Sequence, residues 1–308
     1  MAKRRAFFPL SLITGLVLTA CKGETRPSVQ DTTPVLSPPA PSIPSPALNP
    51  GWDKDKAGPV VLIPASEDRT AASVVIPFLT DSALAHAQSA SVDSLVGMNF
   101  ELFDRKGVVG SARLATSAQM PVSEGCLSWP IITLEANQRP WLIAFRKGIV
   151  TPLPLDSLEG SSSSDSLRMT TELARLASAL PETTDPAFQG LPFSIRKAYR
   201  TPGGDVLIGD VIRKINEEAN PREEHILLIA ERSSLSAAGQ YVTAFHTRSA
   251  GSEDAVRTTE ILSAVRFVNG GDTAIFVSFG YEDGTRIALI DRIANSWKLV
   301  WRSAYSGC

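Results

Sequence analysis

Short apolar runs separated by turn-forming residues dominate the chain from residue 59 onward, and β-branched or aromatic side chains fill many of them. This pattern predicts short buried strands. In the first half, we expect strands at residues 59–63, 73–76, 98–102, 108–114, 131–134 and 141–145. Asp104-Arg105-Lys106-Gly107 indicates a hairpin turn between the third and fourth of these strands. We also expect the fifth and sixth strands to pair with each other through a turn at residues 137–140.

One segment has the spacing of an amphipathic helix, at about residues 165–180. Its apolar stripe is the set Met169, Leu173, Leu176 and Leu180, which repeats every three to four residues. The serine run 161–164 offers N-caps, Ser162 and Asp165 match a capping box, and Pro181 ends the helix. We expect the stripe to pack on a sheet, with a partner-binding face as the alternative.

After the helix the strand pattern resumes, and its regularity indicates the fold class. Expected strands lie near residues 192–200, 205–215, 225–232, 240–248, 261–268, 273–280, 285–291 and 296–303. Turns at these intervals predict a mainly β chain, built as an antiparallel sandwich, a barrel or propeller-like sheets with one helix. We divide it into an N-terminal β region (57–160), the helix (161–181) and a C-terminal β region (182–308), with the two β regions either separate or parts of one domain.

A weak internal repeat lies in the C-terminal region. Gly203-Gly204-Asp205 and Gly270-Gly271-Asp272 are offset by 67 residues, and an arginine, Arg196 or Arg266, stands in the preceding strand. Together with Trp297-Lys298-Leu299-Val300-Trp301, this stretch loosely resembles the blades of secreted propeller-type repeats. Coincidence between two β-hairpins is the alternative explanation.

Tryptophans are the largest apolar side chains within the expected strands. They are Trp129, Trp141, Trp297 and Trp301. Their apolar neighbours favour core packing, and a sugar-binding aromatic face is the alternative. Trp297 and Trp301 share strand parity, so both are expected on the same side of the sheet.

The amino terminus has the organisation of an export signal. Lys3, Arg4 and Arg5 precede residues 6–20, which are almost wholly apolar and carry no charge, as in a secretory signal peptide. Leu18-Thr19-Ala20-Cys21 then resembles the lipobox of bacterial lipoproteins. The resemblance implies removal of residues 1–20 and a lipid on Cys21 that anchors the chain to a membrane. An ordinary secretory signal with an incidental cysteine is the alternative.

The residues after Cys21 indicate at which membrane the chain is anchored and how far from it the folded part lies. Lys22 follows it, whereas aspartate at this place favours inner-membrane retention in well-studied lipoproteins. The resemblance therefore implies the outer membrane, facing the periplasm. Eight prolines lie between residues 22 and 50, without any aromatic residue, so residues 21–56 are expected to be a disordered tether. About 29 residues of it would reach roughly 90 Å if fully extended.

Charge and cysteine content limit the possible functions. Without Lys3, Arg4 and Arg5, the mature chain has 27 basic and 32 acidic side chains. It has no basic stripe of the kind that nucleic-acid binding requires. With Cys21 lipidated, Cys126 and Cys308 remain in an oxidising compartment and are expected to form a disulfide. Closing a loop of this length is worth about 5 kcal/mol in the chain-entropy model. Two separate thiols are the alternative.

The sequence contains no motif that indicates a catalytic residue, a metal site or a cofactor site. A Gly-x-Ser-x-Gly elbow is absent. Ser194-Ile195-Arg196-Lys197 fits Ser-x-x-Lys, but it lies in an expected strand without the companion motifs. The histidines, His86, His225 and His246, lack the spacing of metal ligands.

The most polar stretch, residues 216–225, is the candidate interaction site. It contains Glu217, Glu218, Glu223, Glu224 and His225, and we expect these residues in a loop between two strands. A partner-binding surface, a solvated hairpin and a carboxylate pair for acid–base chemistry are the alternatives. The sequence therefore favours a lipid-anchored binding or structural module that contacts an envelope protein or glycan. A hydrolase of peptidoglycan, glycan or peptide is the alternative.

Overall fold

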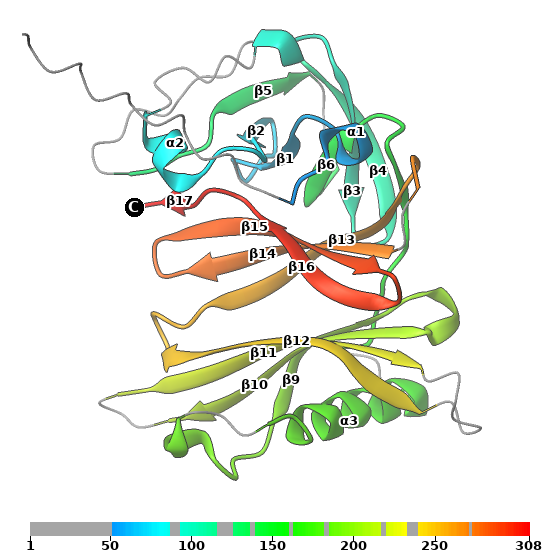
Figure 1. The fold of residues 1–308 in the computed structure, drawn as a ribbon, viewed down its shortest axis with the longest axis vertical. Helices are drawn as coiled ribbons and strands as arrows, with labels where there is room; N and C mark the ends of the chain where they lie inside the picture. The colour runs from blue at the N-terminus through cyan, green and yellow to red at the C-terminus, as the bar shows by residue number, and fades with distance from the viewer. Residues whose placement is uncertain are drawn as a thin grey trace, which may run out of the picture. The chain divides into compact units, whose positions relative to one another are not determined.

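The structure, a computed structural model, describes residues 51–86, 93–115, 126–135, 139–159, 163–181, 185–216, 220–232, 240–270 and 273–308. All of these belong to one compact unit of the chain. The unit is mainly β and consists of four layers (Figure 1). A closed barrel packs on a six-stranded sheet, this sheet packs on a five-stranded sheet, and one long helix covers the outer face of the five-stranded sheet.

The barrel is formed by six short strands from the first half of the chain. They are β1 (Val61–Pro64), β2 (Ala71–Val75), β3 (Asn99–Asp104), β4 (Gly107–Leu114), β5 (Ile131–Glu135) and β6 (Ile143–Arg146). Phe100, Leu102 and Trp141 are fully buried in its interior, because alternate residues of a strand point to the same side. The expected hairpin is confirmed: β3 pairs with β4, and Asp104 accepts two backbone hydrogen bonds in the turn.

The expected pairing of the fifth and sixth strands is wrong. β5 lies between β2 and β4, while β6 lies between β3 and β1. The closing contact aligns Leu62 with Ala144. Closure of a barrel removes both sheet edges, and here it gives β6 two partners from earlier in the chain. The partners of β6 are therefore determined by closure and not by sequence adjacency.

The second half of the chain forms two stacked antiparallel meanders. The five-stranded sheet contains β8 (Asp156–Ser157), β9 (Ser194–Arg200), β10 (Val206–Ile215), β11 (Arg222–Arg232) and β12 (Tyr241–Ser252). The six-stranded sheet contains β7 (Val150–Pro152), β13 (Thr258–Phe267), β14 (Thr273–Tyr281), β15 (Gly284–Ile293), β16 (Ser296–Arg302) and β17 (Ser306–Gly307). All eight strands expected after the helix are confirmed, with small differences in their bounds.

The two expected β regions share strands and a core. β7 and β8 lie in the sequence assigned to the N-terminal region, yet they pair with β13 and β9. Phe145 of the barrel stacks edge-on against Phe276 of the six-stranded sheet, with ring centroids 4.8 Å apart. One hydrophobic cluster thus joins the barrel to the sheet.

Trp297 and Trp301 face opposite sides of the six-stranded sheet, so the shared-parity prediction is wrong. Trp297 packs between the two sheets, whereas Trp301 packs on the barrel side. The register shifts between Leu289 and Ile290, which leaves Val300 as an extra residue in β16. A bulge of this kind reverses the side-chain alternation beyond it. All four expected core tryptophans are buried.

The long helix, α3 (Ser164–Ser178), packs its apolar stripe on the five-stranded sheet, as expected. Leu173 is fully buried and approaches Gly209 of β10, where a β-carbon would lie 3.0 Å from its methyl carbons. The N-cap is Ser163, which lies in the expected serine run 161–164 and accepts a hydrogen bond from the Ser166 amide at 3.1 Å. The expected capping box at Ser162 is therefore wrong. Ser162 itself lies outside the described residues.

The folded unit begins earlier than residue 57, so the last part of the expected tether is wrong. Trp52 packs on Trp301, with ring centroids 4.6 Å apart, and its indole donates to the Gly58 carbonyl at 2.8 Å. The short helix α1 (Lys54–Ala57) follows, capped by Asp53. An aromatic side chain that can bury in a core orders the residues around it.

Cys126 and Cys308 are joined in a disulfide with Cα atoms 4.2 Å apart, in agreement with the expected pairing. The disulfide ties the last residue of the chain to the segment before β5. A second short helix, α2 (Asp81–His86), lies between β2 and β3. Among the described residues, no helix combines the length and apolar character that a membrane crossing requires.

Candidate functional site

The expected interaction loop is wrong in its second half, because Glu223, Glu224 and His225 lie in β11 and are buried. In β11 they pair with Lys214, Arg213 and Ile212 of β10. A cluster of charged residues near the end of a strand resembles an exposed loop in the sequence. In β11, however, Glu223 and Glu224 each lie opposite a basic residue of β10. Glu217 and Glu218 lie outside the described residues.

His225 faces the space between the two sheets and contacts two carboxylates. Its Nε2 lies 2.6 Å from Glu223 Oε2, and its Nδ1 lies 3.7 Å from Asp210 Oδ1. Burial opposes protonation of the ring, but the two carboxylates outweigh it, so the pKa of His225 is raised. Lys214 also binds Glu223. The ring is only 3% exposed, so this group stabilises the fold and is closed to a ligand.

On the helix side of the same strands, Arg213 and Glu224 form a buried ion pair. The Arg213 Nε lies 2.5 Å from Glu224 Oε2, with side chains 4% and 0% exposed. The guanidinium also lies over the ring of Phe193, 4.6 Å from its centroid. Full burial again leaves no surface for a partner.

The residues of the Ser-x-x-Lys match and His246 all lie in strands of the five-stranded sheet. Ser194 and Lys197 lie in β9, as expected, and Lys197 contacts Glu260 at 3.5 Å. Within the described part of the chain, no group of three or more His, Cys, Asp and Glu side chains is placed to hold a metal ion. His246 lies in β12, where it is directly opposite Leu228 of β11.

The two arginines of the internal repeat have different environments. Arg196 donates to Asp210 at 2.6 Å and to the Thr259 carbonyl at 3.0 Å, so it links the two sheets. Arg266 is exposed and lines a surface pocket. The two copies of the repeat therefore place their arginines in different environments.

Two pockets meet at Arg232, beside the first Gly-Gly-Asp turn. The turn includes a short 3₁₀ segment, Pro202–Gly204, in which Gly203 and Gly204 have φ of 83° and 72°. Such values favour glycine. Arg232 lines both pockets, and its backbone amide donates to the Asp205 carbonyl at 2.8 Å. This contact fixes the turn to the end of β11.

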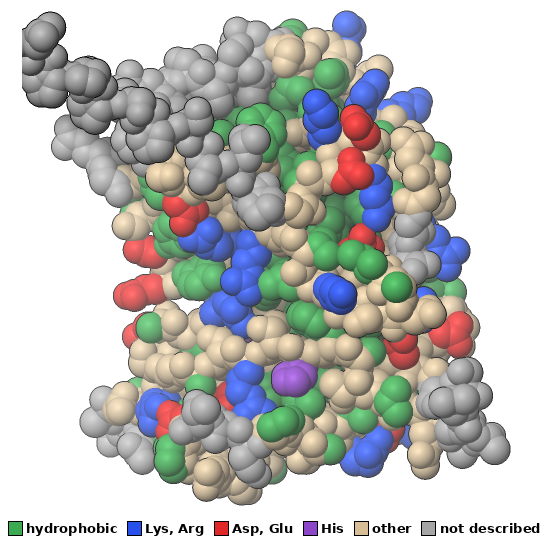
Figure 2. All heavy atoms as spheres, viewed as in Figure 1, with side chains coloured by type: hydrophobic (Ala, Val, Ile, Leu, Met, Phe, Trp, Pro, Cys, Tyr) green, Lys and Arg blue, Asp and Glu red, His purple; other side chains and the backbone are tan. Residues whose placement is uncertain are grey.

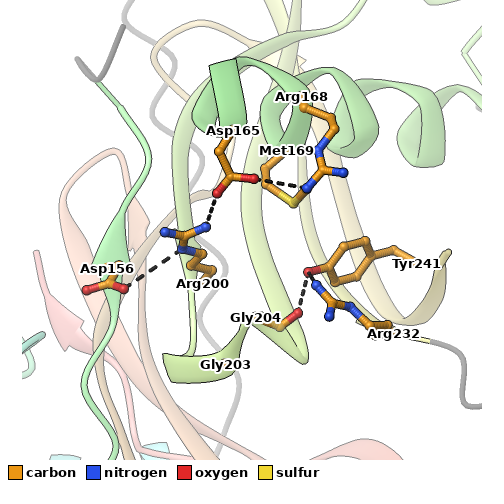
Figure 3. A pocket seen from close by; sticks show the side chains of 9 residues that line it. All are labelled: Asp156, Asp165, Arg168, Met169, Arg200, Gly203, Gly204, Arg232 and Tyr241. Atoms are coloured by element: carbon orange, nitrogen blue, oxygen red, sulfur yellow. Dashed lines mark hydrogen bonds and ion pairs between the residues drawn. The ribbon is translucent and has the colours of Figure 1, made fainter. Parts of the chain in front are cut away.

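The first pocket, which we call the helix-side pocket, has a volume of about 310 Å³ and is shown in Figure 3. It is lined by Asp156, Asp165, Arg168, Met169, Arg200, Gly203, Gly204, Arg232 and Tyr241. Asp165 lies between Arg168 and Arg200, and Arg200 also faces Asp156 at 3.8 Å. The pKa of Asp165 is lowered, first by Arg168 and then by Arg200. A general acid needs a raised pKa, so this carboxylate is unsuited to that role.

The second pocket, which we call the inter-sheet pocket, has a volume of about 670 Å³ and lies at the end of the layer between the two sheets. It is lined by Leu153, Thr201, Pro202, Asp205, Val206, Glu231, Arg232, Val242, Arg266, Thr273, Arg292 and Asn295. Both sheets contribute: Asp205 belongs to the first Gly-Gly-Asp sequence, and Thr273 follows the second, of which residues 271 and 272 lie outside the described residues. Three arginines here face two carboxylates.

The three arginines of the inter-sheet pocket differ in how they are neutralised. Arg292 donates to Glu231 at 2.6 Å, and Trp297 also donates to this carboxylate at 2.9 Å. Arg232 contacts the Tyr241 hydroxyl at 3.3 Å, and this contact raises its pKa. Among the described residues, no carboxylate forms an ion pair with Arg232 or Arg266. Within the described part of the chain, the pocket therefore presents two guanidinium groups without a paired carboxylate.

Sequence reasoning noted Arg266 but missed Arg232 and Arg292. Arg292 and Arg266 lie on meander strands separated by β14, and Arg232 belongs to the other sheet. Only the stacking of the sheets brings them to one pocket. The repeated Gly-Gly-Asp sequence was the available signal, because Asp205 of the first copy and Thr273 after the second both line the pocket.

Neither Glu223 nor Glu224 lines these two pockets. Comparison with protein-family models, curated proteins and solved structures finds no match to this chain. The function must therefore be argued from the geometry of the pockets and from the amino terminus.

Proposed function

We propose that this chain is a lipid-anchored protein of the cell envelope that binds an anionic ligand in the inter-sheet pocket. The observation that carries the proposal is the pair Arg232 and Arg266, which has no carboxylate partner in the described part of the chain. Arginine binds carboxylate and phosphate through charge-assisted hydrogen bonds. Because no carboxylate of the described residues forms an ion pair with either arginine, an oxyanion is the natural complement.

The rest of the pocket supports a ligand with an apolar part. Leu153, Val206 and Val242 supply aliphatic surface, and Thr273 and Asn295 supply polar groups. A few polar groups around apolar surface are typical of ligand pockets. The volume of about 670 Å³ falls within the range of such pockets. We therefore favour a glycan or peptide fragment that carries a carboxylate or phosphate.

The proposed location follows from the lipobox at Leu18–Cys21 and from the proline-rich residues after it. A lipid on Cys21 would hold the chain at the outer membrane, facing the periplasm, with the folded unit at the end of the tether. Peptidoglycan carries carboxylates and phosphorylated glycolipids carry phosphates, so both offer the oxyanion that the two arginines would bind. A binding role is preferred to a hydrolase because Glu231, one of the two carboxylates of the inter-sheet pocket, is already held by Arg292 and Trp297.

The test is a titration of the purified folded unit with two classes of probe. One class is soluble peptidoglycan fragments, with the same fragments amidated at their carboxyl groups as control. The other class is inorganic phosphate and phosphorylated glycolipid. We expect one class to bind and its affinity to fall as salt rises, because contacts with exposed charges are screened.

Matched variants locate the binding. Arg266→Gln is expected to weaken binding by about tenfold or more, the size of one lost charge-assisted hydrogen bond. Arg146→Gln, an exposed arginine of the barrel, should leave it unchanged. The proposal fails if neither class binds, if amidated fragments bind equally well, or if both variants behave alike.

A further inference from the structure

The first Gly-Gly-Asp turn separates the inter-sheet pocket from the helix-side pocket. The inter-sheet pocket is lined on this side by Thr201, Pro202 and Asp205, and the helix-side pocket is lined by Gly203 and Gly204. Because the two glycines carry no side chain, the wall between the pockets consists there of backbone alone. The two pockets are therefore neighbours across a single turn of the chain.

Arg232 lines both pockets, and its guanidinium is held in place by the residues around the turn. It lies over the Tyr241 ring, 5.5 Å from the centroid, and donates to the Tyr241 hydroxyl at 3.3 Å. This hydroxyl in turn donates to the Gly204 carbonyl. A β-carbon at Gly204 would lie 3.3 Å from Arg232 Nη2, so the absence of a side chain allows this approach. A group that is already ordered loses less entropy on binding a ligand.

The helix-side pocket offers hydrogen-bond donors and acceptors side by side. Asp165 accepts from Arg168 at 3.0 Å and from Arg200, and Asp156 faces Arg200 at 3.8 Å. Arg168 and Asp156 are exposed. A guanidinium has five N–H donors and a carboxylate has about four acceptor sites, so these ion pairs keep groups of both kinds for a ligand. A sugar hydroxyl both donates and accepts, and therefore matches such a surface.

Charges of both signs are mixed on the surface and in the two pockets. Figure 2 shows Lys and Arg side chains close to Asp and Glu side chains over much of the face that it draws. Together the pockets contain five arginines and four carboxylates, namely Arg168, Arg200, Arg232, Arg266, Arg292, Asp156, Asp165, Asp205 and Glu231. A ligand with an acid group on every unit would meet these carboxylates. A chain that joins one acidic unit to a neutral unit fits both pockets.

We propose that the two pockets form one site for an acidic oligosaccharide. An acidic sugar binds Arg232 and Arg266 in the inter-sheet pocket, and a neutral sugar of the same chain crosses the turn into the helix-side pocket. This inference rests on the proposed function and narrows its ligand to a glycan of two or more units. At about 310 Å³, the helix-side pocket lies at the lower end of the range of ligand pockets, so it is expected to hold one unit.

The test compares monosaccharides with disaccharides by calorimetric titration of the purified folded unit. One series is glucuronic acid and its disaccharide with N-acetylglucosamine. The other is N-acetylglucosamine 6-phosphate and the corresponding phosphorylated disaccharide. In the series whose acid group fits the two arginines, we expect the disaccharide to bind about tenfold or more tightly than the monosaccharide, because the added unit gains at least one hydrogen bond to a charged group.

Matched variants assign the gain in affinity to the helix-side pocket. Arg168→Gln is expected to lower the ratio of disaccharide to monosaccharide affinity, whereas Arg146→Gln, at an exposed position of the barrel, should leave this ratio unchanged. A thermal unfolding curve for each variant shows that it is folded.

Three outcomes would overturn the inference. These are equal affinities of the monosaccharide and the disaccharide, equal ratios in the two variants, and failure of every sugar to bind. In each case the titrations with peptidoglycan fragments and phosphate still decide the proposed function separately. Tighter binding of a serine–glutamate–serine peptide than of either disaccharide would identify a peptide as the ligand and would also overturn the inference.

Discussion

Removal of the charge of Glu224 gives the sharpest test of how the five-stranded sheet is stabilised. Glu224 and Arg213 are 2.5 Å apart and almost fully buried. The next cation, Arg248, lies 3.6 Å from the other carboxylate oxygen. Glu224→Gln keeps the shape of the side chain but leaves Arg213 buried without its counter-ion. Breaking one side of a buried pair costs about 3–5 kcal/mol, so we expect a loss of that size in the free energy of unfolding.

The control is an exposed pair of the same residue types. Arg175 and Glu172 of α3 are 2.6 Å apart, but their side chains are 56% and 22% exposed. Glu172→Gln should cost less than about 1 kcal/mol, because exposed pairs contribute little. Equilibrium unfolding in urea measures both changes. If the two variants lose the same free energy of unfolding, burial does not decide the contribution of the Arg213–Glu224 pair, and the reasoning is refuted.

Three further predictions concern other parts of the fold. Cys308→Ser should lower the free energy of unfolding by about 2–5 kcal/mol, and an unchanged value, or two free thiols by alkylation of the unreduced protein, would argue against the disulfide. Leu173→Ala should cost about 2–5 kcal/mol in urea unfolding, because this side chain is fully buried between α3 and the sheet; a loss below about 1 kcal/mol would contradict that packing. His225 is stabilised in its protonated form, so its pKa in the folded protein lies above the unfolded value of about 6.5. Its contribution is full below pH 6.5 and is lost as the pH rises through the folded pKa, and urea unfolding at several pH values should show this fall in the parent but not in His225→Gln.

Local patterns in the sequence were sufficient for most strands and for the helix. The turn at residues 104–107 and the stripe that contains Leu173 depend on neighbouring residues, and both are confirmed. The bulge at Val300 could not be read from the sequence, because an extra residue leaves the apolar pattern of β16 intact while it reverses the side of Trp301. Hydrophobic period alone does not reveal such an irregularity.

The remaining errors come from interactions between distant parts of the chain. β6 pairs with β1 and β3 because the barrel closes, and no local signal predicts closure. Glu223, Glu224 and His225 resemble an exposed loop until their cross-strand partners on β10 are known. The inter-sheet pocket has the same origin, since its arginines come from three strands of two sheets.

The measurement that tests the central proposal most directly is hydrogen–deuterium exchange of the protein bound to its native envelope, compared with the purified folded unit. The envelope supplies the ligand, so its chemical identity need not be chosen in advance. The account predicts slower exchange on the envelope at residues 201–206, 231–232 and 292–295, which line the inter-sheet pocket, with no change in the barrel strands at residues 99–114. Protection confined to the barrel, or no protection at all, would contradict it.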